Sequence, residues 1–226
     1  MGKNYLIFFS FVVLLFFVMS CTPQQQPATA TPKAEEKVVE KPSEEVQPKT
    51  VIAPQKQISA EIKDLLSKSK TRVSSIYYKY RGPETGTDFD EFYIKGDKIK
   101  YRPAREIQSL DQPNSFDTIF IDTTAKTAYS YCEAAYCKVH GKKADLNYDS
   151  AYIQTVFDWI NVNQAEKIGE EVIESRNTWK LQTNKGVVWV DVFYGVPLKA
   201  EADGKTYRFE QIAVNSVKDT DIVPSS

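Results

Sequence analysis

A long stretch without aromatic residues divides this chain and limits which part of it can fold. From Thr22 to about Lys56 the sequence holds six proline residues, alternating lysine and glutamate, and no Phe, Trp or Tyr. Such a stretch cannot bury enough apolar surface to order itself. Fully extended, these roughly 35 residues reach at most ~115 Å. We therefore predict a tether over 21–56 and one folded domain over 57–226.

The residues before the tether are typical of an export signal. Lys3 precedes an apolar run from Leu6 to Met19, which has the length of a signal-peptide core and is shorter than a membrane-spanning helix. The run ends in Val18-Met19-Ser20-Cys21, which resembles the lipobox of prokaryotic lipoproteins. The resemblance implies a signal peptide over 1–20 and a lipid on the Cys21 thiol. Alternatives are an uncleaved anchor helix or an ordinary signal peptide with a chance cysteine.

A lipid on Cys21 has a physical consequence for where the protein lies. Acyl chains such as palmitate hold a protein to a bilayer through about 0.8 kcal/mol per buried methylene, so two or more long chains anchor it stably. We expect the chain to be a cell-envelope lipoprotein, held on the extracytoplasmic face of the cell membrane.

Charge and composition exclude several functions. The chain has 29 basic and 30 acidic residues and no basic stripe, so we expect no binding to nucleic acid. It has a single histidine, His140, and no catalytic triad, phosphate loop or carboxylate pair stands out. We therefore expect a monomeric protein that is not an enzyme and that carries no cofactor or metal.

Hydrophobic patterns predict an α+β domain. A helix is expected from an N-cap at Ser59 to about Thr71, with Ile62, Leu65 and Leu66 on its apolar side. A second helix is expected after Asp149 or Ser150, with an apolar stripe of Ile153, Val156, Phe157 and Ile160. Strands are predicted over 75–80, 89–94, 99–101, 118–121, 128–131, 171–173, 178–181, 187–194 and 206–214. This order favours a strongly curved antiparallel sheet, an incomplete barrel, wrapped over helices; a closed barrel with no helix inside is the alternative.

Motifs near the end of the chain suggest a family. Trp189 and Asp191 are followed by a Gly-x-Pro-Leu-Lys run (195–199), Asp203-Gly204, Phe209 and the run Ile212-Ala-Val-Asn215. This order resembles the LolA/LolB superfamily of lipoprotein-localisation proteins. The glycine, proline and aspartate positions also have a purely structural role, because they suit turns between strands.

The resemblance implies an apolar cavity that receives acyl chains or lipoprotein tails. Aromatic side chains assigned to this cavity are Tyr78, Phe92, Phe157, Trp189 and Phe193. The run 187–194 is apolar on both sides, which fits a strand that lines a lumen but equally fits ordinary core packing. Membrane-bound members of the family use an exposed apolar loop residue, for which Val51, Ile52 and Leu110 are candidates.

Cys132 and Cys137 are separated by four residues in a predicted hairpin turn. In an exported protein a local disulfide is the default for such a pair. A redox pair, or a metal site completed by His140 with Glu133 or Asp145, stays open as an alternative.

Two functions of different classes follow. The first is an anchored lipoprotein whose domain binds acyl chains or lipoprotein tails. The alternative is a non-enzymatic module of the envelope that binds another protein and takes no lipid.

Overall fold

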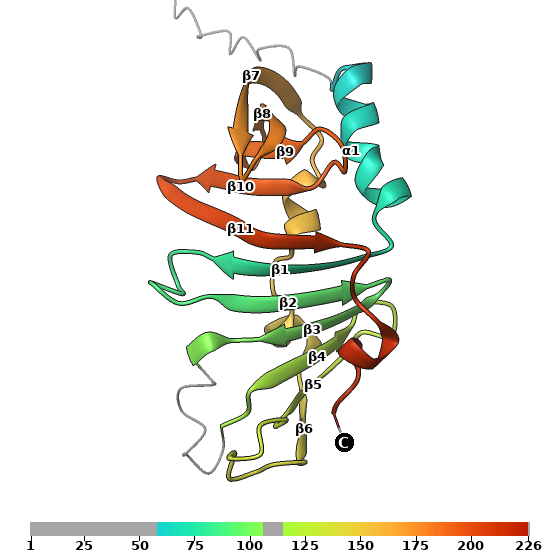
Figure 1. Cartoon of the computed structure of the whole chain (residues 1–226), viewed down its shortest axis with the longest axis vertical. Coiled ribbons are helices and arrows are strands. Elements are labelled where there is room, and N and C mark those ends of the chain that lie inside the picture. Colours follow the sequence, from blue (N-terminus) through green and yellow to red (C-terminus); the bar gives the residue numbers. More distant parts are fainter. Residues whose placement is uncertain (1–57, 106–114, 226) are drawn as a thin grey trace, which may run out of the picture. The chain divides into compact units, whose positions relative to one another are not determined.

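An antiparallel sheet dominates the folded part of the chain. The computed structural model describes residues 58–105 and 115–225. Over these residues eleven strands form one sheet in the order β6-β5-β4-β3-β2-β1-β11-β10-β9-β8-β7 (Figure 1). The strands are β1 (Ser75–Arg81), β2 (Asp90–Lys95), β3 (Lys98–Arg102), β4 (Thr118–Asp122), β5 (Thr127–Tyr131), β6 (Lys143–Leu146), β7 (Ala165–Ile173), β8 (Arg176–Thr183), β9 (Gly186–Asp191), β10 (Pro197–Ala202) and β11 (Lys205–Val214). The predicted antiparallel sheet is confirmed.

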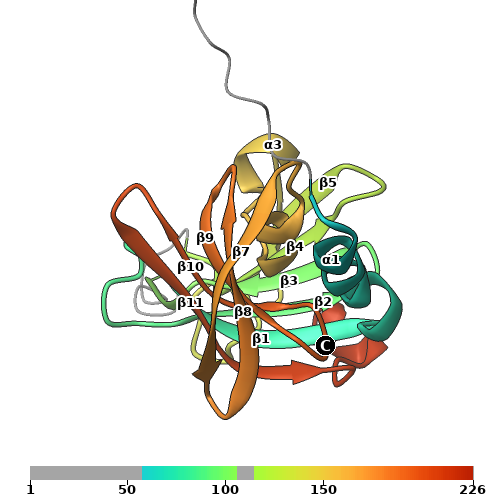
Figure 2. The same cartoon turned by 90° about the horizontal axis from the view of Figure 1, so that it is seen from above.

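The sheet is open, so the closed barrel is wrong. β6 and β7 stand at its two ends, and the central pair joins the first strand, β1, to the last, β11. The chain crosses from β6 to β7 through α3 (Tyr148–Ala151) and the 3-10 helix η1 (Val156–Ile160). In Figure 2 this crossover and the helix α1 (Ala60–Arg72) lie beside the sheet, on the side toward which it curves.

The prediction missed the strands at the edges of the sheet. β6 was not expected, and β7 begins at Ala165, well before the predicted start at residue 171. Both strands are mostly exposed and rich in charged residues, so they lack the alternation of apolar and polar residues that identifies a half-buried strand. β10 was also missed, because Pro197 opens it and proline lowers strand propensity.

The first helix is confirmed and the second is wrong. The Ser59 hydroxyl caps α1 by accepting from the Ile62 N–H at 3.4 Å, and α1 ends at Arg72. In place of the second helix the chain makes the single turn α3, an extended link, and then η1. The break arises because Thr155 starts a new turn with Asp158, whose Oδ2 accepts from the Thr155 N–H at 2.7 Å.

One face of the sheet carries the core. The strand register places Ile76, Tyr78 and Tyr80 of β1 on the same face as Phe92 of β2 and Phe209 of β11. Tyr78 stacks on Phe92 with ring centroids 4.9 Å apart, and Phe209 meets Tyr78 edge-on at 5.7 Å. Ile62 and Leu65 of α1 join this cluster, so the helix is held by burial of one of its sides.

The turn between β9 and β10 docks on α1. The buried Asp191 carboxylate accepts hydrogen bonds from the Phe193 and Tyr194 N–H groups at 2.8 and 2.7 Å. From the helix, Lys68 Nζ donates to the Val192 carbonyl at 3.2 Å and an Arg72 nitrogen donates to the Phe193 carbonyl at 2.8 Å. The turn and the helix are therefore fixed to each other by charge-assisted hydrogen bonds.

Gly195 permits this docking. Its φ of +69° lies in the left-handed region, and a Cβ there would lie 2.4 Å from the Leu65 carbonyl oxygen. Gly204, in the β10–β11 turn, has a similar φ of +71° with nothing within 4 Å of such a Cβ. Both glycines therefore need a left-handed backbone conformation. Of the two, only Gly195 also lies against the backbone of α1.

We expect Gly195→Ala to destabilise the domain by about 3 kcal/mol, because it combines left-handed strain with a clash against α1. The matched control Gly204→Ala should cost only about 1 kcal/mol, for backbone strain alone. Urea unfolding of both variants measures the difference. Equal losses would show that the contact with α1 adds nothing.

Candidate functional site

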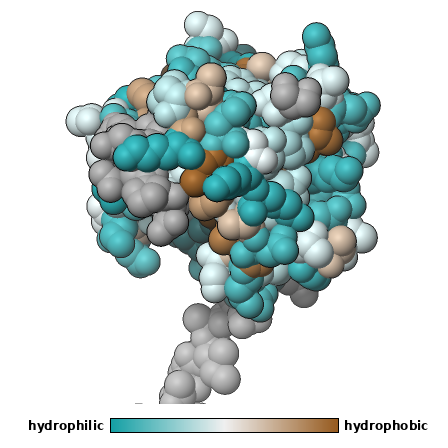
Figure 3. All heavy atoms as spheres, turned by 90° about the horizontal axis from the view of Figure 1, so that it is seen from below, coloured by the Kyte–Doolittle hydropathy of each residue, from teal (hydrophilic) through white to brown (hydrophobic). Residues whose placement is uncertain are grey.

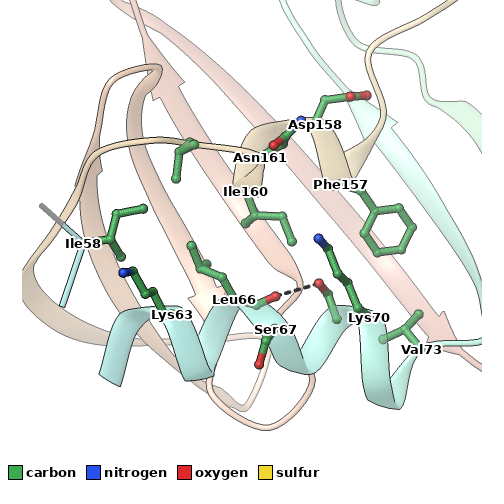
Figure 4. Close-up of a pocket in the computed structure, with 12 residues that line it drawn as sticks. Ile58, Lys63, Leu66, Ser67, Lys70, Val73, Phe157, Asp158, Ile160 and Asn161 are labelled. Atoms are coloured by element: carbon green, nitrogen blue, oxygen red, sulfur yellow. Dashed lines mark hydrogen bonds between the residues drawn. The ribbon is translucent and has the colours of Figure 1, made fainter. Parts of the chain in front are cut away.

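An apolar groove lies between α1 and the segment that contains η1. Its volume is about 590 Å³, within the roughly 300–1,000 Å³ typical of ligand sites. Apolar side chains from both walls face each other across it (Figure 4). The residues that line it are Ile58, Lys63, Leu66, Ser67, Ser69, Lys70, Val73, Phe157, Asp158, Ile160, Asn161 and Val162.

The α1 wall results from a helix with two different apolar sides. Ile62 and Leu65 are buried in the core, whereas Leu66 and Val73 are only half-buried and line the groove. Leu66 lies in the middle of α1, and Val73 follows directly after its last residue, Arg72, so together they form the apolar part of this wall. The helix thus packs on the sheet with one side and offers the other to the groove.

The opposite wall is held in place by a buried tyrosine. The Tyr78 hydroxyl accepts a hydrogen bond from the Val156 N–H at 3.1 Å, at the start of η1. Burial raises the pKa of Tyr78 well above its usual value, so the hydroxyl stays neutral. η1 then presents Phe157 and Ile160 to the groove, while Val156 and Trp159 are buried.

Charged groups stand around the apolar walls. Lys63 and Lys70 of α1 line the groove, as does Asp158 of η1. The Asp158 carboxylate accepts from the Thr155 hydroxyl at 2.8 Å and from the Tyr152 hydroxyl at 2.9 Å, besides the Thr155 N–H. Its Oδ2 therefore serves the local cap, whereas the two lysines extend from the helix surface.

The predicted cavity-lining residues do not come together. Phe157 lines the groove. Tyr78 and Phe92 are fully buried and stack on each other in the core. Trp189 and Phe193 are not among the residues that line the groove.

Trp189 lies on the outer face of the sheet beneath lysine side chains. Its ring has the ammonium nitrogen of Lys199 at 4.1 Å and that of Lys180 at 4.7 Å, and it is only 2% exposed. Its indole N–H donates to a Glu171 carboxylate oxygen at 2.6 Å. The apolar character of both sides of β9 thus results from core packing on one face and lysine stems on the other.

Phe193 is 62% exposed in the β9–β10 turn. The Arg72 guanidinium lies 4.7 Å from its ring centroid, and the Tyr194 ring packs edge-on at 4.7 Å. Its backbone is fixed through Asp191, so the ring projects from a rigid turn.

The sequence did not single out the groove residues as a set. Leu66 was assigned to the apolar side of the first helix together with Ile62 and Leu65, but nothing in the pattern separates the side that meets the sheet from the side that meets η1. No motif in the sequence marks the lysines at 63 and 70. The sequence held one signal for the groove: the apolar side of the first helix is wider than packing on the sheet alone requires.

Cys132 and Cys137 form the predicted disulfide. The buried Asp117 carboxylate accepts from the Glu133 and Ala134 N–H groups at 2.8 Å each, which fixes the start of the loop.

His140 is exposed, and within residues 58–105 and 115–225 no group of His, Cys, Asp or Glu side chains is placed to hold a metal ion. Figure 3 views the domain from the end where β6 lies, and this surface is mostly hydrophilic.

Several predicted positions lie outside the described residues: Cys21, Val51, Ile52 and Leu110. In the part of the chain that the structure covers, no helix is both long and apolar enough to cross a membrane.

Comparisons with known proteins give only distant similarities. No protein-family model and no curated protein matches the sequence. Among solved structures, the chain is similar to a LolA superfamily protein from Nitrosomonas europaea (8% identity, TM-score 0.31, covering 73% of this chain and 98% of that one). It is also similar to LprF from Mycobacterium bovis (11%, 0.38, 72% and 97%) and to MucB in its complex with MucA (10%, 0.40, 75% and 60%). The first of these belongs to the superfamily that the C-terminal motifs resemble; similarities this distant carry no information on ligand or partner.

We expect no free thiol at positions 132 and 137 in the denatured, unreduced protein. Replacing both cysteines by alanine should lower the free energy of unfolding by about 2 kcal/mol, because the disulfide closes only a short loop. Thiol titration and urea unfolding measure the two effects. Two free thiols in the unreduced protein would contradict the disulfide.

Proposed function

We propose that this chain is an extracytoplasmic lipoprotein, anchored to the cell membrane through Cys21, whose domain binds acyl chains or lipoprotein tails in the groove between α1 and η1. The observation that carries the proposal is the groove itself. Leu66 and Val73 on one wall face Phe157 and Ile160 on the other, and the groove between them is open (Figure 4).

The size of the groove suits an acyl chain. Removing a methylene from water is favourable by about 0.8 kcal/mol, so ten buried methylenes supply roughly 8 kcal/mol before the costs of association. Aliphatic and aromatic walls offer this gain without demanding a hydrogen-bond pattern. They therefore fit a ligand that is recognised by its apolar surface.

The architecture supports the same proposal. The open sheet curves toward the side on which α1 and the crossover from β6 to β7 lie (Figure 2), an arrangement that suits a sheet wrapped over helices. The groove opens between two elements that are held to the sheet at separate points, one at the β9–β10 turn and one at Tyr78. Each wall is a separate element that packs on the core with one side, so the space between the two walls can change without breaking the pairing of the strands.

The predicted tether sets the reach of the domain. Cys21 precedes the first described residue, Ile58, by 37 positions. At about 3.3 Å per residue the two lie at most ~120 Å apart. A domain held in this way stays in the envelope and samples the space near the membrane, where acylated molecules are found.

The alternative function, a protein-binding module without a lipid ligand, has one observation in its favour. Phe193 projects from a rigid turn beside Arg72, and aromatic and arginine side chains dominate the energetics of protein interfaces. The groove favours the first function, and the experiment below separates the two.

We expect the full chain, extracted in a non-ionic detergent, to retain bound lipid in native mass spectrometry. Ile160→Gln should reduce the lipid-bound fraction several-fold, because it places an amide in the apolar wall without a partner. Val172→Gln is the matched control: this valine is 64% exposed on β7, outside the groove, and its replacement should leave lipid binding unchanged.

Thermal unfolding checks that both variants fold. A wild-type chain that carries no lipid and takes up no added fatty acid would refute acyl-chain binding. If Phe193→Ser then abolished cross-linking to an envelope protein, the alternative function would replace it.

We expect Cys21→Ser to release the protein from the membrane while the domain stays folded, because the proposed lipid is attached outside residues 57–226. Fractionation of cells followed by limited proteolysis measures release and folding separately. Retention of the variant in the membrane fraction would show that the anchor is not a lipid on Cys21.

A further inference from the structure

We propose that the groove selects amphiphiles with an anionic headgroup, a carboxylate or a phosphate, which Lys63 and Lys70 bind at its rim. This inference rests on the proposed function, because the apolar groove provides the binding and the lysines provide the choice of headgroup.

The two lysines lie on the same side of α1 as the apolar wall. They are seven residues apart, so their Cα atoms are separated by about 10.5 Å along the helix. Leu66 lies between them. Figure 4 shows Lys63 near Ile58, at one end of the groove, and Lys70 reaching toward Phe157 and Ile160, at the other.

The other basic side chains of the helix have structural partners. Lys68 donates to the Val192 carbonyl and lies 3.7 Å from an Asp64 carboxylate oxygen. Arg72 donates to the Phe193 carbonyl and stacks on its ring. Within residues 58–105 and 115–225, neither Lys63 nor Lys70 has a carboxylate oxygen within 4 Å. Their ammonium groups therefore remain available to a ligand.

The charge around the groove is positive. Asp158 is the acidic residue among those that line it, and its Oδ2 already accepts three hydrogen bonds. Lys185 Nζ donates to the Asp158 backbone carbonyl at 2.6 Å, which brings a third ammonium group close to η1. An anionic headgroup at the rim is thus favoured, and a cationic one is disfavoured.

An acyl chain that lies along α1 places its headgroup at one end of the groove. A lysine is present at either end, and lysine binds a carboxylate or phosphate as a point charge without demanding one orientation. Both ammonium groups are exposed, so each contributes modestly. We expect the two together to favour an anionic over a neutral amphiphile by about fivefold.

Native mass spectrometry of the full chain in non-ionic detergent tests this with three ligands that share a palmitoyl chain. Palmitic acid supplies a carboxylate, 1-palmitoylglycerol 3-phosphate supplies a phosphate, and 1-palmitoylglycerol is neutral. We expect both anionic ligands to bind about fivefold more tightly than the neutral one, and this preference should shrink as salt is added.

The double variant Lys63→Gln/Lys70→Gln should lose the preference while it binds the neutral ligand as the wild type does. The matched control is Lys98→Gln/Lys205→Gln, which removes two exposed lysines outside the groove and should keep the preference. Circular dichroism and thermal unfolding check that both variants fold.

The outcomes separate this inference from the proposed function. Equal binding of all three ligands by the wild-type chain, or an unchanged preference in the groove variant, overturns the headgroup selection and leaves acyl-chain binding intact. Binding of none of them overturns both. Displacement of palmitic acid by inorganic phosphate at the same concentration would show a site for a free anion, and would also overturn the inference.

Discussion

The position of α1 depends on the turn between β9 and β10. Asp191 ends β9 and binds two successive N–H groups of the turn, which aims the carbonyls of Val192 and Phe193 at the helix. Lys68 and Arg72 bind those carbonyls, and Gly195 lets the two backbones approach. Arg176 adds to this arrangement from β8, 3.4 Å from the Asp191 carboxylate, and donates to the Ile212 carbonyl of β11 at 3.0 Å. One buried carboxylate thus links β8, β9, the turn and, through the turn, α1.

The groove exists because its two walls are fixed at different points of the same sheet. α1 is held at the β9–β10 turn and by Asn215 after β11, whose side-chain oxygen accepts from the Ser74 N–H at 2.7 Å and whose amide donates to the Arg72 carbonyl at 2.9 Å. η1 is held by Tyr78 of β1. Since each wall has its own support, the space between them does not close when the core packs. The apolar side chains left there are the half-buried ones, such as Leu66 and Ile160.

The helix also divides its basic residues between two tasks. Lys68 and Arg72 stabilise the turn, whereas Lys63 and Lys70 line the groove. The difference follows from helical geometry, because residues five apart, such as 63 and 68, are separated by about 140° around the helix axis. These three lysines and one arginine look alike in a sequence. Their separation into structural and ligand-facing groups depends on what each side of the helix meets.

The local features follow from the order of the residues. The Ser59 cap, the neighbouring strands β2 and β3 and the pairing of Cys132 with Cys137 all depend on residues close in the sequence, and the structure has them. The remaining features depend on contacts between elements. The Tyr78 hydroxyl holds the start of η1, 78 residues further along the chain, lysine stems from the neighbouring strands β8 and β10 cover Trp189, and packing against the turn leaves a groove beside Leu66. A periodic pattern states that a side chain is apolar without stating what will cover it, so these contacts could not be read from the sequence.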